Sequence, residues 1–336
     1  MTRRFVLWLL AAALAAAAPR FPGKTWEKAR PAGWSEAKLQ EARDYAGTIQ
    51  TAAVMIIQGG AVVEEWGETA RKFNCHSMRK SVMSALYGIH AKGGRIKLGK
   101  TLAELGIDDN EPKLTDVEKQ ATVLDLLKAR SGIYHAALYE TPGMAARRPG
   151  RGSHAPGTFW YYNNWDFNAL LTIFEQETRL KFFEEVDRRL AKPLEMEDFR
   201  VEDGVYFTGE ASVHPAYPIR MTARDLARFG LLYLRGGKWR DQQIVPEDWV
   251  RESTRPHSDA GSEGISKLGY GYMWWVSDNA GKTAFSARGA GGHYVWVIPE
   301  RDLVIVHRVN TDDRQSVSER EMGNLLRLIL AAGPQN

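Results

Sequence analysis

Residues 53–66 read Ala53-Val-Met-Ile-Ile-Gln-Gly-Gly-Ala-Val-Val-Glu-Glu-Trp66, two β-rich runs around a glycine pair. Apolar and β-branched residues fill both runs, and Gly59-Gly60 supplies the backbone freedom of a tight turn, so the stretch predicts a β-hairpin. Comparable runs of apolar and β-branched residues recur only near the other end of the chain. Strands are predicted there over residues 270–276, 285–289, 293–298 and 303–309.

Helical periodicity dominates the sequence between these two β-rich ends. Helices are predicted over residues 77–91, 123–129, 168–177, 182–190 and 222–235, and two more, at 35–45 and 318–332, border the β-rich segments. In the last of these, Ser318 and Glu321 have capping-box spacing. We therefore expect an α+β fold, in which one antiparallel sheet forms from both chain ends, flanked by helices, and an inserted, mostly helical lobe leaves a cleft for a site.

The predicted domain boundaries follow from this pattern. We expect residues 34–336 to form a single domain, with a sheet lobe from residues 34–74 and 266–336 and a helical lobe from residues 75–265. Residues 19–33 are rich in Pro, Lys and Arg and predict an extended lead-in.

The first 18 residues have the pattern of a bacterial-type signal peptide. Arg3 and Arg4 precede a short apolar core and an alanine tract with small residues suited to cleavage near Ala18. The apolar run of about 14 residues is shorter than the roughly 20 that span a bilayer, which disfavours a membrane anchor. We expect a periplasmic or secreted protein with no stable membrane span after cleavage.

Charge and cysteine content exclude several classes of partner. The 336-residue chain has a formal net charge of +4, which falls to +2 once Arg3 and Arg4 are removed, so nucleic acid is not an expected partner. The one cysteine, Cys75, cannot form an internal disulfide. None of the eight histidines has the spacing of a zinc-binding motif, and no nucleotide loop is evident, so neither metal nor cofactor is expected.

The most specific local signal is Ser77-Met78-Arg79-Lys80 at the start of a predicted helix. A spacing of three places the hydroxyl and the amine on one helical face, and the helix N-terminus favours a developing negative charge on the serine oxygen. Lys80 can accept the serine proton only if burial or nearby positive charge lowers its pKa from about 10.4. Alone, this short pattern occurs by chance in many long proteins.

A second segment makes the pattern specific. Pro156-Gly157 is followed by Thr-Phe-Trp-Tyr-Tyr-Asn-Asn164. Ser-x-x-Lys, then Pro-Gly, then Tyr-x-Asn resembles the serine β-lactamase and penicillin-binding-protein superfamily, in its class C, DD-peptidase and esterase branch. Segments 122–132, 221–237, 244–249 and 269–275 resemble that family in the same order. The resemblance implies a β-lactamase/transpeptidase-like fold, with Tyr162 assisting proton transfer and Asn164 holding the lysine and the substrate. Tyr161 with Asn163 is the alternative register.

The family's third motif, Lys-Thr-Gly or His-x-Gly, is where this chain departs. Ala287-Arg288-Gly289 occupies the matching position, without the usual first cation or imidazole, while Lys282-Thr283-Ala284 lies too far upstream. The resemblance implies an oxyanion hole from the backbone N–H groups of Ser77 and Ala290. Gly289 would let strand and substrate approach closely, and Arg288 is either a contact for a substrate carboxylate or a solvated sheet residue.

These residues predict a serine hydrolase that cleaves an amide or ester through an acyl-Ser77 intermediate. Catalysis is assigned to Ser77, Lys80 and Tyr162, with either Lys80 or Tyr162 as the base. Because Ala287 carries no charge for the antibiotic carboxylate, we expect weak or no β-lactamase activity and favour small or peptide acyl substrates. The alternative is a module that binds or senses β-lactams or peptidoglycan fragments with little turnover.

Overall fold

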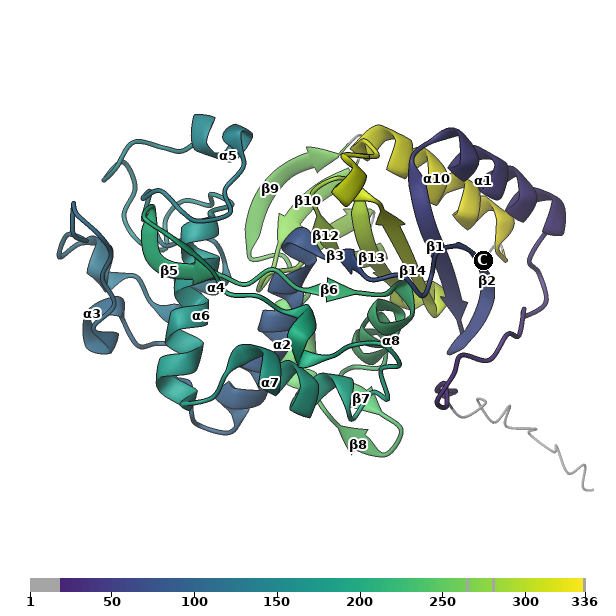
Figure 1. Ribbon diagram of the computed structural model, residues 1–336, viewed down its shortest axis with the longest axis horizontal. Coiled ribbons are helices and arrows are strands. Elements are labelled where there is room, and N and C mark those ends of the chain that lie inside the picture. The colour runs from purple at the N-terminus through teal and green to yellow at the C-terminus, as the bar shows by residue number, and fades with distance from the viewer. Residues whose placement is uncertain (1–18, 264–265, 280–281, 335–336) are drawn as a thin grey trace, which may run out of the picture.

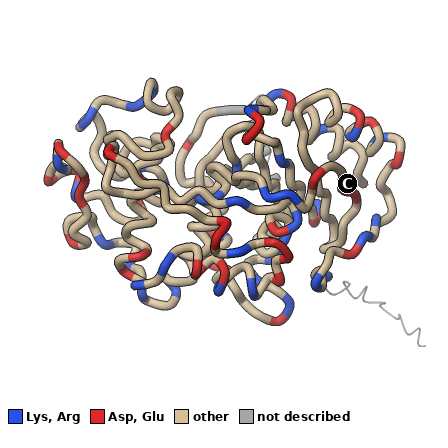
Figure 2. Tube along the Cα trace, viewed as in Figure 1, with Lys and Arg blue, Asp and Glu red and all other residues tan. Residues whose placement is uncertain are grey.

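The computed structural model describes residues 19–263, 266–279 and 282–334, and Figure 1 shows a lobe built around a sheet beside a mostly helical one. The predicted signal peptide, residues 1–18, lies outside the described residues. Within the described part, no helix combines the length and the apolar character needed to cross a bilayer. Figure 2 shows Lys and Arg interspersed with Asp and Glu over both lobes.

One antiparallel sheet joins the two ends of the chain. Its order is β2-β1-β14-β13-β12-β11-β10-β9, and Ile56 of β1 lies opposite Ile305 of β14. This arrangement confirms the predicted α+β fold with a sheet assembled from both ends. The strands are β1 (Thr51–Gln58), β2 (Ala61–Gly67), β9 (Ser258–Glu263), β10 (Ser266–Tyr270), β11 (Trp275–Asn279), β12 (Lys282–Gly289), β13 (His293–Ile298) and β14 (Leu303–Val309).

Both faces of the central strands are covered, which explains their uninterrupted apolar runs. Along β1, Val54 and Ile56 pack into a cluster with α1 (Glu36–Thr48) and α10 (Glu319–Ala332), whereas Met55 and Ile57 join the larger core on the opposite face. Figure 1 shows α1 and α10 side by side over the first of these faces. The predicted capping box of Ser318 and Glu321 begins α10.

Helix α8 (Ala223–Leu234) packs on the second face of the sheet, against β1, β13 and β14. Helices α2 (Arg79–Lys92) and α6 (Asn164–Thr178) build the core of the helical lobe. The remaining elements are α3 (Leu102–Leu105), α4 (Val123–Leu127), α5 (Pro142–Ala146), α7 (Phe182–Val186), α9 (Glu247–Ser253), β3 (Phe73–Asn74), β4 (Phe207–Gly209), β5 (Ser212–Ala216), β6 (Arg220–Met221), β7 (Lys238–Trp239) and β8 (Gln242–Gln243).

The predicted strand over residues 270–276 is wrong, because its middle forms the turn between β10 and β11. Met273 adopts a positive φ of 61°, which a strand does not tolerate, and Gly271 lies directly against the backbone of Ser253. The sheet also begins earlier than residue 266, at Ser258, since the polar β9 gave no apolar alternation to detect.

Arg308 of β14 connects the sheet, through hydrogen bonds, to the segment that leads into Ser77. Its guanidinium is fully buried and donates to the carbonyl oxygens of Met221, Phe73 and Asn74 at 2.8, 2.9 and 3.0 Å, and to Nδ1 of His293 at 3.0 Å. A buried charge is tolerated when its donors are satisfied. Arg308 therefore fixes where strand β3 ends, immediately before the turn that carries Ser77.

Two helical glycines give opposite predictions for stability. A Cβ on Gly230 of α8 would lie 2.6 Å from Cγ1 of Val304 and 2.9 Å from Cγ1 of Val295, whereas nothing lies within 4 Å of a Cβ on the exposed Gly323 of α10. Gly230→Ala should lower the free energy of unfolding by about 1–3 kcal/mol through overpacking. Gly323→Ala should raise it by up to about 1 kcal/mol.

Urea unfolding of both variants, followed by circular dichroism, measures these changes. The close packing of α8 on the sheet would be contradicted by a Gly230→Ala variant at least as stable as the parent chain.

Candidate active site

A strained turn presents Ser77. The chain leaves β3, passes through a 3₁₀ turn at His76–Met78 and enters α2 at Arg79. His76 has a positive φ of 46°, unusual for a residue with a side chain, and its N–H donates to Oδ1 of Asn74 at 2.9 Å. Such conformations persist where the surroundings enforce them, and they cluster at functional sites. Ser77 is only half-buried, so its hydroxyl remains accessible.

Lys80 lies one helical turn later, and its side chain is buried at the junction of three segments. Its exposed fraction is 1%, and Nζ lies 3.1 Å from Oγ of Ser77, 2.6 Å from the hydroxyl of Tyr162 and 2.7 Å from Oδ1 of Asn164. Nζ also lies 4.0 Å above the centroid of the Tyr162 ring. The structure thus brings together four side chains that were singled out in the sequence.

Burial lowers the pKa of Lys80 well below its usual value, and the neighbouring Arg79 guanidinium lowers it further. Both effects favour the neutral amine. A neutral amine has two N–H donors and one lone pair, so Lys80 can donate to Asn164 and still accept a proton from a hydroxyl. The geometry and the lowered pKa therefore fit proton transfer between the Ser77 hydroxyl and the Lys80 amine.

The geometry distinguishes between the two registers of the Tyr-x-Asn segment. The Tyr161 hydroxyl donates to the carbonyl of Met144, and Oδ1 of Asn163 caps α6 by accepting from the Trp165 N–H. Tyr162 and Asn164 are the pair that contacts Lys80. Burial raises the pKa of Tyr162 to about 12, so its phenol is protonated at neutral pH.

Strand β12 passes the nucleophile turn at its C-terminal end. A Cβ on Gly289 would lie 2.6 Å from the carbonyl oxygen of Cys75, so only glycine lets the strand come this close. Ala290, directly after it, is exposed. Lys282 begins the same strand and lies roughly 23 Å from Gly289, at about 3.3 Å per residue. The Lys282-Thr283-Ala284 segment therefore lies at the far end of β12 from Ser77.

Arg288 does not belong to the cluster of Ser77, Lys80, Tyr162 and Asn164, but it is linked to that cluster through the ring of Trp275. Its Nε donates to Oγ of Ser286 at 3.0 Å, and its guanidinium lies 5.4 Å from the Trp275 ring centroid. The Trp275 ring in turn lies 5.3 Å from that of Tyr162. Arg288 therefore borders the aromatic side of the site, without a direct contact to Lys80 among those identified.

Two residues of this site were missed in the sequence. The carbonyl of Tyr139 accepts Nδ2 of Asn164 at 2.6 Å, and its hydroxyl accepts Nδ2 of Asn74 at 2.7 Å. Tyr139 has a positive φ of 62° in a long loop, and no local pattern marks such a position. The other is Arg79. The sequence pattern indicates only a polar residue at the start of a helix, whereas in the structure its side chain is buried, with an exposed fraction of 1%.

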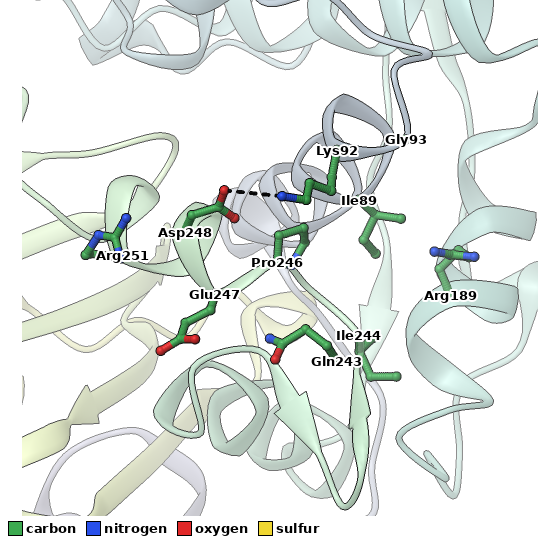
Figure 3. Close-up of a pocket in the computed structure, with 10 residues that line it drawn as sticks. All are labelled: Ile89, Lys92, Gly93, Arg189, Gln243, Ile244, Pro246, Glu247, Asp248 and Arg251. Carbon is green, nitrogen blue, oxygen red and sulfur yellow. Dashed lines mark ion pairs between the residues drawn. The ribbon is translucent and has the colours of Figure 1, made fainter.

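One cavity lies away from this cluster. It has a volume of about 650 Å³ and is lined by Ile89 and Lys92 of α2 and by Glu247 and Asp248 of α9, as Figure 3 shows. These α2 residues are at the opposite end of the helix from Ser77, roughly 20 Å away at 1.5 Å per residue. Among the described residues, no group of three or more His, Cys, Asp or Glu side chains is arranged to hold a metal ion.

The chain is similar to several known proteins. The 6-aminohexanoate-dimer hydrolase of Paenarthrobacter ureafaciens is 25% identical over 286 residues, which are 76% of this chain and 71% of that protein. A Bacillus anthracis structure, provisionally assigned as a 6-aminohexanoate-dimer hydrolase, matches with a TM-score of 0.67 and 20% identity over 93% of this chain and 86% of that one. The octameric penicillin-binding protein homologue of Pyrococcus abyssi matches with a TM-score of 0.65 and 18% identity over 89% and 78%.

The two solved structures share the fold of this chain. A family model described as beta-lactamase matches residues 36–328, which include every residue of the four-side-chain cluster. The match confirms the resemblance inferred from the motifs. The chain belongs to the beta-lactamase family.

Proposed function

We propose that this protein is a serine hydrolase that cleaves an amide or ester through an acyl-Ser77 intermediate. Membership of the beta-lactamase family and the likeness to a named hydrolase support a hydrolase of this superfamily. The observation that carries the proposal is the buried Lys80 amine, 3.1 Å from the Ser77 hydroxyl and without a carboxylate among its hydrogen-bond partners. This arrangement activates a serine without a histidine.

The reaction runs in two balanced steps. Oγ of Ser77 attacks the carbonyl carbon while its proton passes to Lys80, directly or through the Tyr162 hydroxyl. The bond to the leaving amine or alcohol then breaks, and that group takes the proton. Water next attacks the ester carbonyl on Ser77 and gives one proton to the same base. The bond between the acyl carbon and Oγ then breaks, the base returns that proton to Oγ, and the acid is released, which restores both the serine and the base.

The negatively charged oxygen formed in each step needs preorganised donors. We assign this role to the backbone N–H groups of Ser77 and Ala290, because Gly289 brings the end of β12 against the turn that precedes Ser77. Removing one such donor typically costs about 3 kcal/mol of transition-state stabilisation. Tyr162 and Asn164 hold the amine of Lys80, and Asn164 retains a second amide hydrogen for the substrate.

The substrate class follows from the departure at the third motif. Ala287 is buried and uncharged, so no side chain there pairs with the carboxylate of a β-lactam. We therefore propose little β-lactamase activity and favour small linear amides, esters or peptides. The relative named 6-aminohexanoate-dimer hydrolase supports this preference, because its name gives a substrate that is not a β-lactam. Arg288 borders the site and is our candidate contact for an acidic group of the substrate.

We also propose that the protein is exported to the periplasm or the medium. The support is the sequence pattern of residues 1–18, a basic start followed by an apolar core and small residues. Cleavage near Ala18 would leave the described chain intact, because the described residues begin at Pro19. Intact mass spectrometry of the recovered protein tests this cleavage.

The central experiment treats the purified protein with a fluorophosphonate and with nitrophenyl butyrate. We expect one phosphonate adduct on Ser77 and turnover of the ester, and Ser77→Ala should abolish both while leaving the melting temperature nearly unchanged. Labelling without turnover of esters, amides or peptides would favour the binding or sensing module. Ester turnover that survives in Ser77→Ala would overturn the assignment.

The two adjacent tyrosines provide a matched pair of variants. Tyr162→Phe removes the hydroxyl 2.6 Å from Nζ of Lys80 and should lower kcat by about 10²–10⁴-fold, the usual contribution of a positioned proton-transfer group. Tyr161→Phe removes a hydroxyl bound to the Met144 carbonyl and should change kcat little. Steady-state kinetics with the same ester tests both. Equal losses in the two variants would contradict the role given to Tyr162.

A further inference from the structure

Arg79 is a buried cation beside the proposed base. It is 1% exposed, and its guanidinium lies between two aromatic rings, 5.2 Å from the Tyr139 centroid and 4.9 Å from the Tyr217 centroid. Nη1 donates to the carbonyl of His76 at 2.8 Å. The other two nitrogens, Nε and Nη2, are buried and lack hydrogen-bond partners, and within the described part of the chain no carboxylate pairs with Arg79.

This environment is poor for stability. A buried charge without a counter-ion costs several kcal/mol, which two aromatic faces and one carbonyl only partly offset. The other buried arginines, Arg228 and Arg308, have more hydrogen-bond or ion-pair partners. Arg228 pairs with Glu197, and Arg308 donates to three carbonyls and a histidine. Because the burial of Arg79 does not favour stability, its presence at this position points to a role in the site.

The position of Arg79 relative to Lys80 indicates that role. Arg79 and Lys80 are consecutive residues of α2 and each is 1% exposed, so positive charges on both would oppose each other across a dry interior. Arginine does not lose its proton in proteins, so the charge that yields is that of Lys80. Arg79 also stacks on Tyr139, whose carbonyl accepts Asn164, and Asn164 in turn contacts Lys80.

We propose that Arg79 is a positioning residue of the proposed hydrolase: its fixed positive charge keeps Lys80 in the neutral form that accepts the Ser77 proton. The inference rests on the proposed function and adds to it a source for the basicity of the site. Without this second charge, the buried cluster of hydroxyls and an amide around Lys80 would tolerate an ammonium better.

Other groups around the site do not take over this role. Tyr162 contacts Nζ of Lys80, Tyr270 packs on the Tyr162 ring, and Tyr217 packs against Arg79. Burial raises the pKa of each phenol, that of Tyr162 to about 12, so all three favour the uncharged form at neutral pH. Asp166 binds Ser131 and Asn163 instead, and burial raises the pKa of its carboxyl well above the usual range. Arg79 is the permanent charge that acts on Lys80.

The test measures the rate of fluorophosphonate labelling of Ser77 as a function of pH in the full-length protein. Labelling requires a deprotonated base, so the rate rises through the pKa of Lys80. Arg79→Gln and Arg79→Met remove the charge and should move the midpoint of this rise upward by about one pH unit, with roughly tenfold slower labelling below the midpoint. Arg79→Lys should move the midpoint upward by less than the neutral variants do, because a buried lysine carries its charge only part of the time.

Arg228→Gln is the matched control, because it removes a buried arginine whose identified contacts do not include Ser77, Lys80, Tyr162 or Asn164. It should lower thermal stability without moving the midpoint. A neutral Arg79 variant that folds and keeps the parental midpoint would overturn the inference, and so would a downward shift. If neither neutral variant folds, the parent chain decides, and a midpoint at the ordinary lysine value of about 10.4 would overturn the inference. Absence of labelling in the parent chain would instead contradict the proposed function.

Discussion

The burial of the Lys80 amine is the constraint on which the site depends. An ammonium removed from water is costly, and the structure supplies no carboxylate to compensate it among the hydrogen-bond partners of Nζ. The lower-energy state is the neutral amine, and a neutral amine held beside a serine hydroxyl is a base. Because Tyr162 and Asn164 come from a segment more than 80 residues along the chain, this environment exists only in the folded protein.

The sheet fixes the position of the serine turn relative to the rest of the site. Arg308 of β14 fixes the end of β3 through backbone carbonyls, and Gly289 of β12 lies against the turn that follows. The serine turn is therefore held by strands from the far end of the chain, whereas Lys80 is enclosed by the helical lobe. A strained His76 backbone can persist at this junction because the packing on both sides determines its conformation.

Sequence patterns predicted the parts of this structure that have local causes. The hairpin around Gly59-Gly60 and the capping box of Ser318 are examples, since short-range geometry decides both. The pairing of Ser77 with Lys80 follows from helical spacing, and Tyr162 was found only through resemblance to a family. Tyr139 and Arg79 could not be found, because their roles come from contacts across the helical lobe. The strand predicted over residues 270–276 failed for a similar reason: its apolar residues are buried by a turn that packs on α9 and the loop after it.

The protonation state of Lys80 can be measured directly. Nitrogen-15 NMR of lysine side chains distinguishes an amine from an ammonium by chemical shift, and the Lys80 signal can be assigned as the one missing from Lys80→Met. The structure predicts that Lys80 changes from ammonium to amine at a much lower pH than a free lysine does, because burial and Arg79 lower its pKa well below the usual value. A Lys80 signal that remains that of an ammonium up to about pH 10, as for a free lysine, would contradict the account.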